Sequence, residues 1–547
     1  KPGGYQRFKQ IAEKLEQLPF HPFTAVDVEK TEALALAIRS DKHHVKAVKP
    51  LPRRKLYSKV PLMDCFTAPC KGGCPIGQDI PEYIELCRRG KYARALEVIL
   101  EKNRLRFITG TICAPHCMDK CTRNFCETRV QIRATKLVAA ERGYDKVMAR
   151  LKTPTPVYDG KKVAIIGGGP TGMAAAYFCG RAGIPTTLFE REGALGGIVR
   201  YVIPDFRISN EAIEKDAALM QKMGVEVKLN TPAPSVEELK AKGYTHILFA
   251  IGAWKPGKLD IPGNVKPVIQ WMRDVKAGKA EELGHAAIIG GGNTAMDAAR
   301  LALRAGAKSS TLVYRRTKKY MPADAEELEL AMADGVQFLE LVSPVEQKDG
   351  KLLCRKMVLG EPDASGRRSP VETDETVSID CDTVISAVGE KVDSDMLAAY
   401  GVSVNDRGRP SFATNLSGVY TAGDALRGPA TVVEGIADAA AFAEAVIGRP
   451  YEVKIPHVAH APRAEAVARK GILCESAKRE GDRCLSCNVV CECCVDVCPN
   501  RANVSIQLPD GRFQILHVDR MCNECGNCAA FCPYDSAPYK EKFTLFH

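Results

Sequence analysis

The fold is decided by the stretch 161–183, KKVAIIGGGPTGMAAAYFCGRAG. A short β-rich run leads into a G-x-G-x-x-G motif formed by Gly167, Gly169 and Gly172. In a dinucleotide-binding unit the first glycine permits the tight turn, the second lets the backbone approach a pyrophosphate, and the third lets the helix pack closely on the strand. The next β-rich run ends at Glu190, 21 residues after Gly169, where a carboxylate can accept hydrogen bonds from ribose hydroxyls. This order of strand, loop, helix and acidic strand end predicts a bound dinucleotide.

A second unit of the same kind follows in 285–316, HAAIIGGGNTAMDAARLALRAGAKSSTLVYRR. Its motif positions are Gly290, Gly292 and Ala295. Its second strand ends in Arg315 and Arg316, where the first unit has Glu190. Arginine accommodates a 2′-phosphate, which a carboxylate would repel. The second unit is therefore predicted to prefer NADP(H) over NAD(H), and the two units together predict a flavin–nicotinamide reductase.

Two dense groups of cysteines lie outside these units. Of the 22 cysteines, eight lie between Cys65 and Cys126 and ten between Cys484 and Cys532. Closely spaced cysteines in a large chain without a secretory signal indicate metal thiolates in a reducing compartment, so we expect a cytoplasmic protein. The formal charge of +11 comes from scattered basic residues, so no nucleic-acid partner is expected. No apolar run approaches the length of a membrane-spanning helix.

The C-terminal group has the spacing of bacterial ferredoxins. Residues 522–533, CNECGNCAAFCP, read C-x2-C-x2-C-x3-C-P, in which the cysteine before proline ligates the other of two clusters. We therefore expect one [4Fe-4S] cluster on Cys522, Cys525, Cys528 and Cys498 and a second on Cys487, Cys491, Cys494 and Cys532. Cys484 and Cys493 are then left over, although Cys484 could take the place of Cys487.

The N-terminal group supplies candidate ligands for one or two further clusters. These are Cys65, Cys70, Cys74, Cys113, Cys117, Cys121 and Cys126. Cys87 lies in a helical pattern and is predicted to be a core residue.

The predicted fold class is α/β, with two nested doubly wound, Rossmann-like domains flanked by two iron–sulfur domains. The expected domains are an α-helical Fe–S domain over 1–150, an FAD-binding domain over 151–255 and 385–450, an NADPH-binding domain over 256–384, and a two-cluster ferredoxin-like domain over 451–547.

Several motifs together resemble one group of enzymes. The segments DCFTAPCKGGCP, AIIGGGPTGMAAA, IIGGGNTAMDAAR, VYRR and YTAGDALRGPATVVEGI are similar to the small subunit of bacterial glutamate synthase, the N-terminal part of dihydropyrimidine dehydrogenase, and the NADP-binding subunit of the bifurcating ferredoxin–NADP transhydrogenase. With its ferredoxin-like end, the chain especially resembles flavoproteins described as selenate reductase subunits, in which a similar block forms the C-terminal part of a longer chain.

The resemblance implies the following ligand sets. FAD would be bound by Gly167, Gly169, Gly172, Glu190, Gly197, Arg207, Gly423, Asp424 and Thr431, and NADPH by Gly290, Gly292, Asn293, Thr294, Arg315 and Arg316. The chain departs from the family pattern at Leu62, where the first cysteine belongs, and at Lys136, where one variant has a Gln or Glu ligand. A protonated lysine cannot serve as a ligand, and Cys126 could complete one of the N-terminal clusters.

The sequence therefore predicts an NADPH-dependent FAD/iron–sulfur oxidoreductase that passes electrons between NADPH and [4Fe-4S] clusters, in either direction. No protein acid–base residue is expected, because catalysis is the placement of the nicotinamide against the flavin. The expected partners are a catalytic subunit or a ferredoxin, and the resemblance suggests a molybdenum-dependent hydroxylase. Two alternatives are a bifurcating transhydrogenase, which would need a second flavin, and a structural electron relay with an idle NADPH site.

Overall fold

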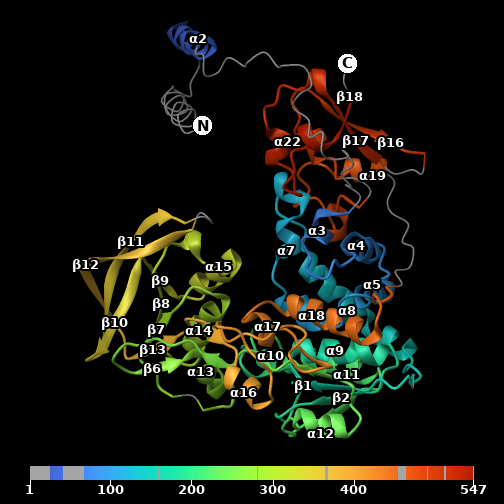
Figure 1. Ribbon diagram of the computed structural model, residues 1–547. Helices are drawn as coiled ribbons and strands as arrows, with labels where there is room; N and C mark the ends of the chain where they lie inside the picture. Colours follow the sequence, from blue (N-terminus) through green and yellow to red (C-terminus); the bar gives the residue numbers. More distant parts are fainter. Residues whose placement is uncertain are drawn as a thin grey trace.

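The computed structural model describes residues 25–40, 67–157, 159–279, 281–363, 367–453, 463–488, 491–509 and 513–545 (Figure 1). The predicted ligand Cys65 and the departure at Leu62 lie outside these ranges. Within them, no helix is both long and apolar enough to cross a membrane.

The first doubly wound unit contains a parallel sheet in the order β15-β4-β1-β2-β3. Its strands are β1 (Val163–Ile166), β2 (Thr186–Phe189), β3 (Glu226–Lys228), β4 (His246–Phe249) and β15 (Val419–Thr421). Its helices are α9 (Pro170–Arg181), α10 (Ile198–Tyr201), α11 (Asn210–Gln221), α12 (Val236–Ala241), α16 (Ser394–Ala399), α17 (Asp424–Arg427) and α18 (Val432–Ile447). Val163 and Ile165 pack into one core and Ala164 and Ile166 into another, which explains why β1 is apolar at every position.

The second unit is inserted between β4 and β15, as the nested fold class predicts, and its parallel sheet has the order β6-β13-β7-β8-β9. Its strands are β6 (Val265–Pro267), β7 (His285–Ile289), β8 (Ser309–Tyr314), β9 (Gln337–Glu340) and β13 (Thr383–Ser386), and its helices are α13 (Val268–Lys276), α14 (Asn293–Arg304), η2 (Lys318–Tyr320) and α15 (Ala325–Ala333). The predicted domain boundary at residue 384 falls inside β13, all of which pairs with β7.

Two smaller sheets complete this half of the molecule. An antiparallel meander consists of β10 (Val342–Lys348), β11 (Lys351–Pro362) and β12 (Arg368–Asp380). Where the chain crosses between the two units, β5 (Lys255–Pro256) pairs antiparallel with β14 (Glu390–Lys391). The two crossings therefore lie side by side.

The N-terminal part is helical, as predicted. The helix α2 (Ala25–Ser40) precedes α3 (Pro69–Gly72), α4 (Ile80–Arg88), α5 (Tyr92–Leu100), α6 (Arg106–Ile112), α7 (His116–Asp119), η1 (Thr122–Phe125) and α8 (Ile132–Arg150). Phe107 and Ile108 of α6 share a buried core with Met173 and Phe178 of α9. This shared core fixes the helical part against the first doubly wound unit.

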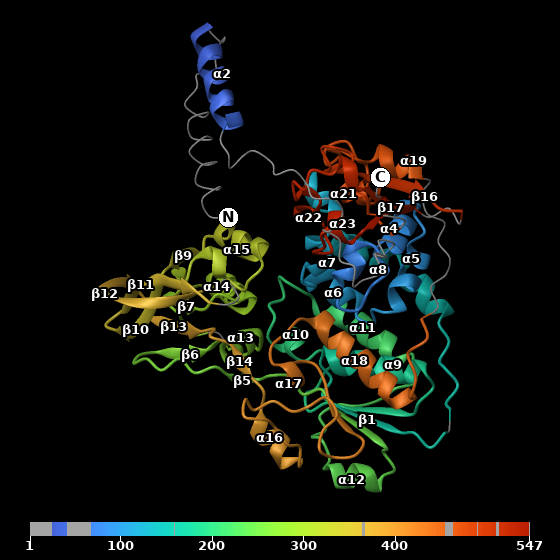
Figure 2. The same ribbon diagram turned by 45° about the horizontal axis from the view of Figure 1, so that its top comes forward.

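The C-terminal part lies over the N-terminal helices on the side away from the sheets (Figures 1 and 2). It comprises α19 (Arg463–Ala468), α20 (Glu480–Arg483), α21 (Cys493–Asp496), β16 (Asn503–Gln507), β17 (Phe513–Val518), η3 (Asp519–Met521), α22 (Asn527–Ala530), α23 (Pro538–Glu541) and β18 (Phe543–Leu545). The strand β17 pairs antiparallel with β16 and parallel with β18. The helical part is thus placed between the nucleotide-binding units and the C-terminal cysteines.

Candidate cofactor sites

The first glycine-rich loop is packed as its motif predicts. Gly167 has φ +104°, and a Cβ on it would lie 2.5 Å from the Ala250 carbonyl oxygen. A Cβ on Gly172 would lie 1.9 Å from the Gly167 carbonyl oxygen, so the helix α9 could not approach the strand with any larger residue. Because α9 begins at Pro170, its N-terminal amides face the loop, where an anion is favoured.

Glu190 holds this loop by two hydrogen bonds. Its Oε2 accepts from the Gly168 amide at 2.6 Å, and its Oε1 accepts from the Glu192 amide at 2.8 Å. A carboxylate has about four acceptor positions, so ribose hydroxyls could still donate to it. Glu190 therefore shapes the loop in addition to its predicted role toward ribose.

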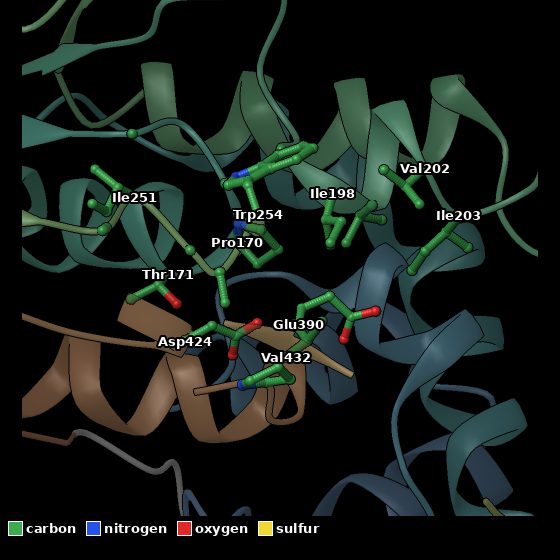
Figure 3. Close-up of a pocket in the computed structure, with 18 of the residues that line it drawn as sticks. Pro170, Thr171, Ile198, Val202, Ile203, Ile251, Trp254, Glu390, Asp424 and Val432 are labelled. Atoms are coloured by element: carbon green, nitrogen blue, oxygen red, sulfur yellow. The ribbon is translucent and has the colours of Figure 1, made fainter. Parts of the chain in front are cut away.

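A cavity of about 520 Å³ extends along both doubly wound units (Figure 3). Its lining includes the predicted FAD ligands Gly167, Gly169, Glu190, Gly197, Arg207, Asp424 and Thr431, and the predicted NADPH ligands Asn293 and Thr294. From the helical part it is lined by Ile112, Cys113, Ala114 and Arg133. The structure thus brings most of the predicted dinucleotide ligands to one cavity that also reaches a predicted iron–sulfur ligand.

Asp424 and Thr431 lie on the α18 side of this cavity. Thr431 is the N-cap of α18 and forms a capping box with Glu434. Burial raises the pKa of Asp424 to about 7, although its carboxylate accepts a hydrogen bond from the Ala430 amide at 3.1 Å. A Cβ on Gly423 would lie 2.3 Å from Thr171 Oγ1, so this glycine allows close packing of the loop on α9.

Two side chains that line the cavity were missed from the sequence. Trp254 lies across the cavity from Val432, and Glu390 points into it beside Asp424 (Figure 3). Burial raises the pKa of Glu390, and its Oε1 has no hydrogen-bond partner among the described residues. Trp254 stands in the stretch FAIGAWKPG, which signals a crossing between domains, but no motif marks Glu390.

Arg207 joins the two doubly wound units. Its guanidinium pairs with Asp297 of α14 at 3.1 Å and with Glu327 of α15. Burial raises the pKa of Asp297 to about 6. Arg207 lines the cavity as its predicted FAD role requires, and its partners show that it also joins the two units.

The second glycine-rich loop lies at the carboxyl edge of its sheet. The Gly290 amide donates to the Val313 carbonyl oxygen at 3.1 Å, and a Cβ on Gly290 would lie 2.3 Å from the Ala387 carbonyl oxygen. Arg315 and Arg316 follow β8, the parallel neighbour of β7, and so lie at the same edge. Gly290, Gly292 and both arginines lie outside the lining of the large cavity.

The cysteines form groups that continue away from the cavity. Cys74, Cys113 and Cys117 line a small second cavity with the buried Lys136. Burial raises the pKa of the Cys117 thiol to about 12, against the opposing effect of the Lys136 charge. Cys113 lines both this cavity and the large one.

At the far end, Cys498 lines a cavity with Cys522, Cys525 and Cys528, the set predicted for one ferredoxin-type cluster. A separate cavity of about 300 Å³ is lined by Cys126, Cys487, Cys491 and Cys493. The predicted ligands Cys494 and Cys532 do not line it, since Cys494 packs in the C-terminal core with Ile515. Cys493, which the sequence left over, thus lines the cavity beside Cys487 and Cys491, and the assignment of Cys494 and Cys532 stays a prediction.

No group of three or more His, Cys, Asp or Glu side chains in the described ranges could hold a metal ion. A cubane distributes its thiolate ligands over several irons, so its ligands need not meet at one point. The donor set of thiols and the separate cysteine groups therefore fit iron–sulfur clusters better than zinc.

Two family models match the chain. The model for pyridine nucleotide-disulphide oxidoreductases matches residues 161–439, and the model for dihydropyrimidine dehydrogenase domain II, 4Fe-4S cluster, matches residues 62–147. The chain belongs to the pyridine nucleotide-disulphide oxidoreductase family. These matches confirm the prediction of an FAD- and NADPH-binding oxidoreductase with a [4Fe-4S] domain. The closely packed first glycine-rich loop and the cysteine groups fit those cofactors.

Several curated proteins are similar to the chain. Oxidoreductase YgfK of Escherichia coli (strain K12) is 42% identical over 572 residues, which cover 100% of this chain and 55% of YgfK. The NADPH-Fe(3+) oxidoreductase subunit beta of Geobacter sulfurreducens is 35% identical, over 69% of this chain and 63% of that protein. The glutamate synthase [NADPH] small chain of Escherichia coli (strain K12) is 29% identical, over 70% of this chain and 89% of that protein. The chain thus spans little more than half the length of YgfK.

Proposed function

We propose that the chain is an electron-transfer module that connects NADPH, through FAD and a series of [4Fe-4S] clusters, to an acceptor or donor on a partner. When bound, FAD exchanges a hydride with NADPH and single electrons with iron–sulfur clusters. The reverse direction of flow would use the same residues.

The position of Cys113 is the observation on which this proposal rests. Cys113 directly follows α6 and lines the large cavity together with the predicted FAD ligands. It also lines the adjoining small cavity with Cys74 and Cys117. Cys113 could therefore hold a cluster at the wall of the cavity whose lining residues would hold the flavin.

The residues of the chain would supply binding and placement. The glycine loop and the start of α9 would hold the flavin pyrophosphate, and Asp424 would bond the ribityl chain. Arg315 would bind the 2′-phosphate of NADPH at the edge of the second sheet. Catalysis would then consist mainly of holding the two ring systems in register, which needs no protein acid or base.

We propose a general class of partner and, within it, one particular kind of enzyme. The names of two relatives, a subunit beta and a small chain, support a catalytic partner subunit, with a ferredoxin as the other candidate. A molybdenum-dependent hydroxylase is the finer proposal and rests on the sequence resemblance alone. The many free thiols support a reducing compartment such as the cytoplasm.

The variant Cys113→Ala tests the role given to Cys113. We expect NADPH to bleach the flavin at the rate of the unmodified protein, while the cluster signals in electron paramagnetic resonance (EPR) spectra no longer appear on that timescale. Cys87→Ala is the matched control, because Cys87 is a buried thiol of the same helical part and burial alone raises its pKa, to about 12. Cluster reduction by NADPH at an unchanged rate in Cys113→Ala would contradict the proposal.

A further inference from the structure

Cys484 belongs to the C-terminal part of the chain but lies among N-terminal cysteines. It follows α20 and packs, with Cys70 and Cys121, against the buried core that includes Ile80 and Tyr83. More than 350 residues separate Cys484 from Cys121 in the sequence. The fold therefore brings to Cys70 and Cys121 a third thiol that sequence spacing could not relate to them.

Neighbouring side chains also bring the Cys121 and Cys484 segments together. Thr122 Oγ1, next to Cys121, lies 3.2 Å from the Sγ of Cys487, three residues after Cys484. Cys121 and Cys484 are both partly buried and pack against the same core. Cys484 thus lies in a group of thiols at the contact between the two parts of the chain.

The backbone at Cys484 is held by side chains from both parts of the chain. Arg123 Nε donates to the Arg483 carbonyl oxygen at 3.0 Å, and Arg469 Nη1 donates to the Cys484 carbonyl oxygen at 3.0 Å. These two hydrogen bonds hold the peptide groups immediately before and immediately after Cys484. The position of its Sγ is therefore determined by the contact between the two parts.

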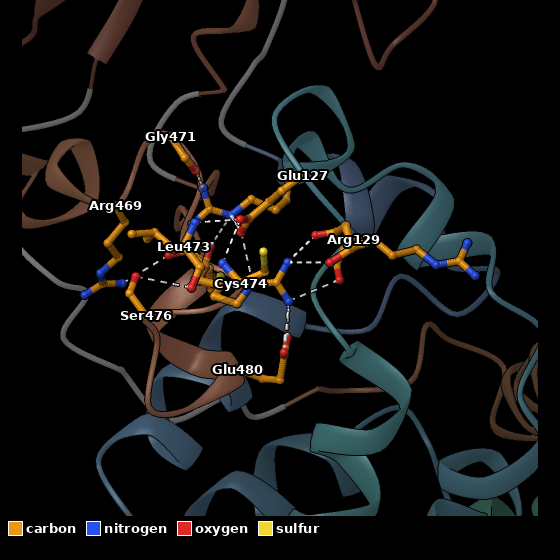
Figure 4. A network of polar contacts seen from close by, with 12 residues as sticks. Glu127, Arg129, Arg469, Gly471, Leu473, Cys474, Ser476 and Glu480 are labelled. Carbon is orange, nitrogen blue, oxygen red and sulfur yellow. Dashed lines mark hydrogen bonds and ion pairs between the residues drawn. The ribbon is translucent and has the colours of Figure 1, made fainter.

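A buried ion pair anchors this contact (Figure 4). Arg483 Nε pairs with Glu127 Oε1 at 3.0 Å, and both side chains are almost fully buried, at 4% and 3% exposure. Glu127 also accepts from the amides of Leu473 and Cys474, at 2.5 and 2.8 Å. Burying a charged pair is unfavourable unless its hydrogen bonds are satisfied. Here the Glu127 carboxylate accepts from two backbone amides and pairs with the Arg483 guanidinium.

We infer that Cys484 is a ligand of an N-terminal [4Fe-4S] cluster that it shares with Cys70 and Cys121, so that this cluster joins the helical part to the C-terminal part. The inference rests on the iron–sulfur part of the proposed function. It explains how a cluster can form although Leu62 stands where the resembling families have a cysteine.

Cys487 is assigned to the next group. Its Sγ lies 3.2 Å from Thr122 Oγ1, and it lines the cavity of about 300 Å³ that also contains Cys491 and Cys493. Cys70, Cys121 and Cys484 pack against the same core as Cys74 and Cys117, which line the small cavity with Cys113. The shared cluster would therefore be the middle step between the cluster near the flavin cavity and the C-terminal clusters.

The test compares Cys484→Ala with Cys474→Ala in the full chain, purified without oxygen. Cys474 lies on the same segment, is exposed and lines none of the cysteine cavities described above, so its loss should leave iron unchanged. In Cys484→Ala we expect a loss of about four iron atoms per chain and of one reduced-cluster EPR signal. FAD content and flavin bleaching by NADPH should be retained, which separates this test from that of the proposed function. Unchanged iron and unchanged EPR spectra would overturn the inference.

If Cys484→Ala does not fold, the variant Cys484→Ser provides the test. A serine oxygen can replace the thiolate as a ligand, so we expect a cluster with altered EPR g values. Spectra identical to those of the unmodified protein would show that Cys484 does not touch a cluster and would overturn the inference.

Discussion

At the scale of single residues, the two arginines after β8 should contribute unequally to nucleotide preference. Arg315 is exposed, whereas Arg316 Nε donates to the Arg368 carbonyl oxygen at 3.1 Å. A hydrogen bond to a charged group contributes about 1.5–3 kcal/mol, so Arg315→Ala should raise the Kd for NADPH by about tenfold or more. The Kd for NADH should stay unchanged.

Equilibrium binding of both nucleotides to Arg315→Ala and Arg316→Ala measures this difference. Arg316→Ala is the matched control and should have the smaller effect, because part of its guanidinium already bonds to β12. An equal loss of NADPH and NADH affinity in Arg315→Ala would contradict the assignment of the 2′-phosphate site.

Asp424 should give the flavin-free protein a pH-dependent stability. Burial raises its pKa to about 7, above the value of about 3.9 in an unfolded chain. The folded state therefore binds the proton more tightly, and the stability from Asp424 is present below pH 4 and lost as the pH rises through about 7. Asp424→Asn should remove this decline between pH 5 and 8, as measured by urea unfolding. The same slope in Asp424→Asn would show that another group causes it.

Several glycines of the two motifs could be assigned from the sequence because they answer a local steric need, as Gly172 does against the Gly167 carbonyl. Glu390 and the pairing of Arg207 with Asp297 could not, because they depend on how distant elements meet. Cys484 is the clearest example, since its thiol neighbours lie in the helical part and no spacing rule connects them.

At the scale of elements, α6 is held by a carboxylate from a different domain. Asp216 of α11 accepts hydrogen bonds from the amides of Phe107 and Ile108, at 3.1 and 2.9 Å, and pairs with Arg106 at 3.0 Å. Asp216 thus satisfies the first amides of the helix that ends beside Cys113. Burial raises the pKa of Asp216 to about 6, so the carboxylate is ionised at neutral pH.

Asp216→Ala should lower the free energy of unfolding by about 3–5 kcal/mol, because it leaves the buried Arg106 charge without its partner. Denaturant unfolding of the flavin-bound protein measures this loss. The double variant Arg106→Met with Asp216→Leu should recover much of the stability, since it removes both charges. A double variant no more stable than Asp216→Ala would show that the amide caps, and not the ion pair, dominate.

The strands and helices of the two nested units follow from alternating β-rich and helical patterns, and their insertion order was predicted correctly. The meander of β10, β11 and β12 was not predicted, because its strands carry neither a glycine-rich motif nor a cysteine spacing. The position of the helical part against α9 and α11 also needed the structure, since the shared core is built from segments far apart in the sequence.

At the scale of the whole molecule, Arg207 is one of the side chains that join the two nucleotide-binding units, as Arg273 is through Glu192. It is the side chain of the first unit that pairs with both Asp297 and Glu327 of the second. Arg207→Met should leave those two carboxylates facing each other and change the placement of NADPH against the flavin. We expect unchanged FAD content and a rate of flavin bleaching by NADPH lower by about tenfold.

Stopped-flow absorbance and FAD quantification separate the two roles considered for Arg207. A variant that loses FAD but, once reloaded, reacts with NADPH at the normal rate would mean that Arg207 acts as an FAD ligand and not as a tie between the units.

The central claim is that electrons pass between NADPH, the large cavity and cysteine groups that lead to the C-terminal part. The most direct test is an anaerobic titration of the purified chain with NADPH and, separately, NADH, following flavin absorbance, cluster EPR and iron content. The account predicts flavin bleaching by NADPH in preference to NADH, followed by signals from reduced [4Fe-4S] clusters. Flavin that NADPH does not bleach, or bleached flavin with clusters that stay oxidised although dithionite reduces them, would contradict it.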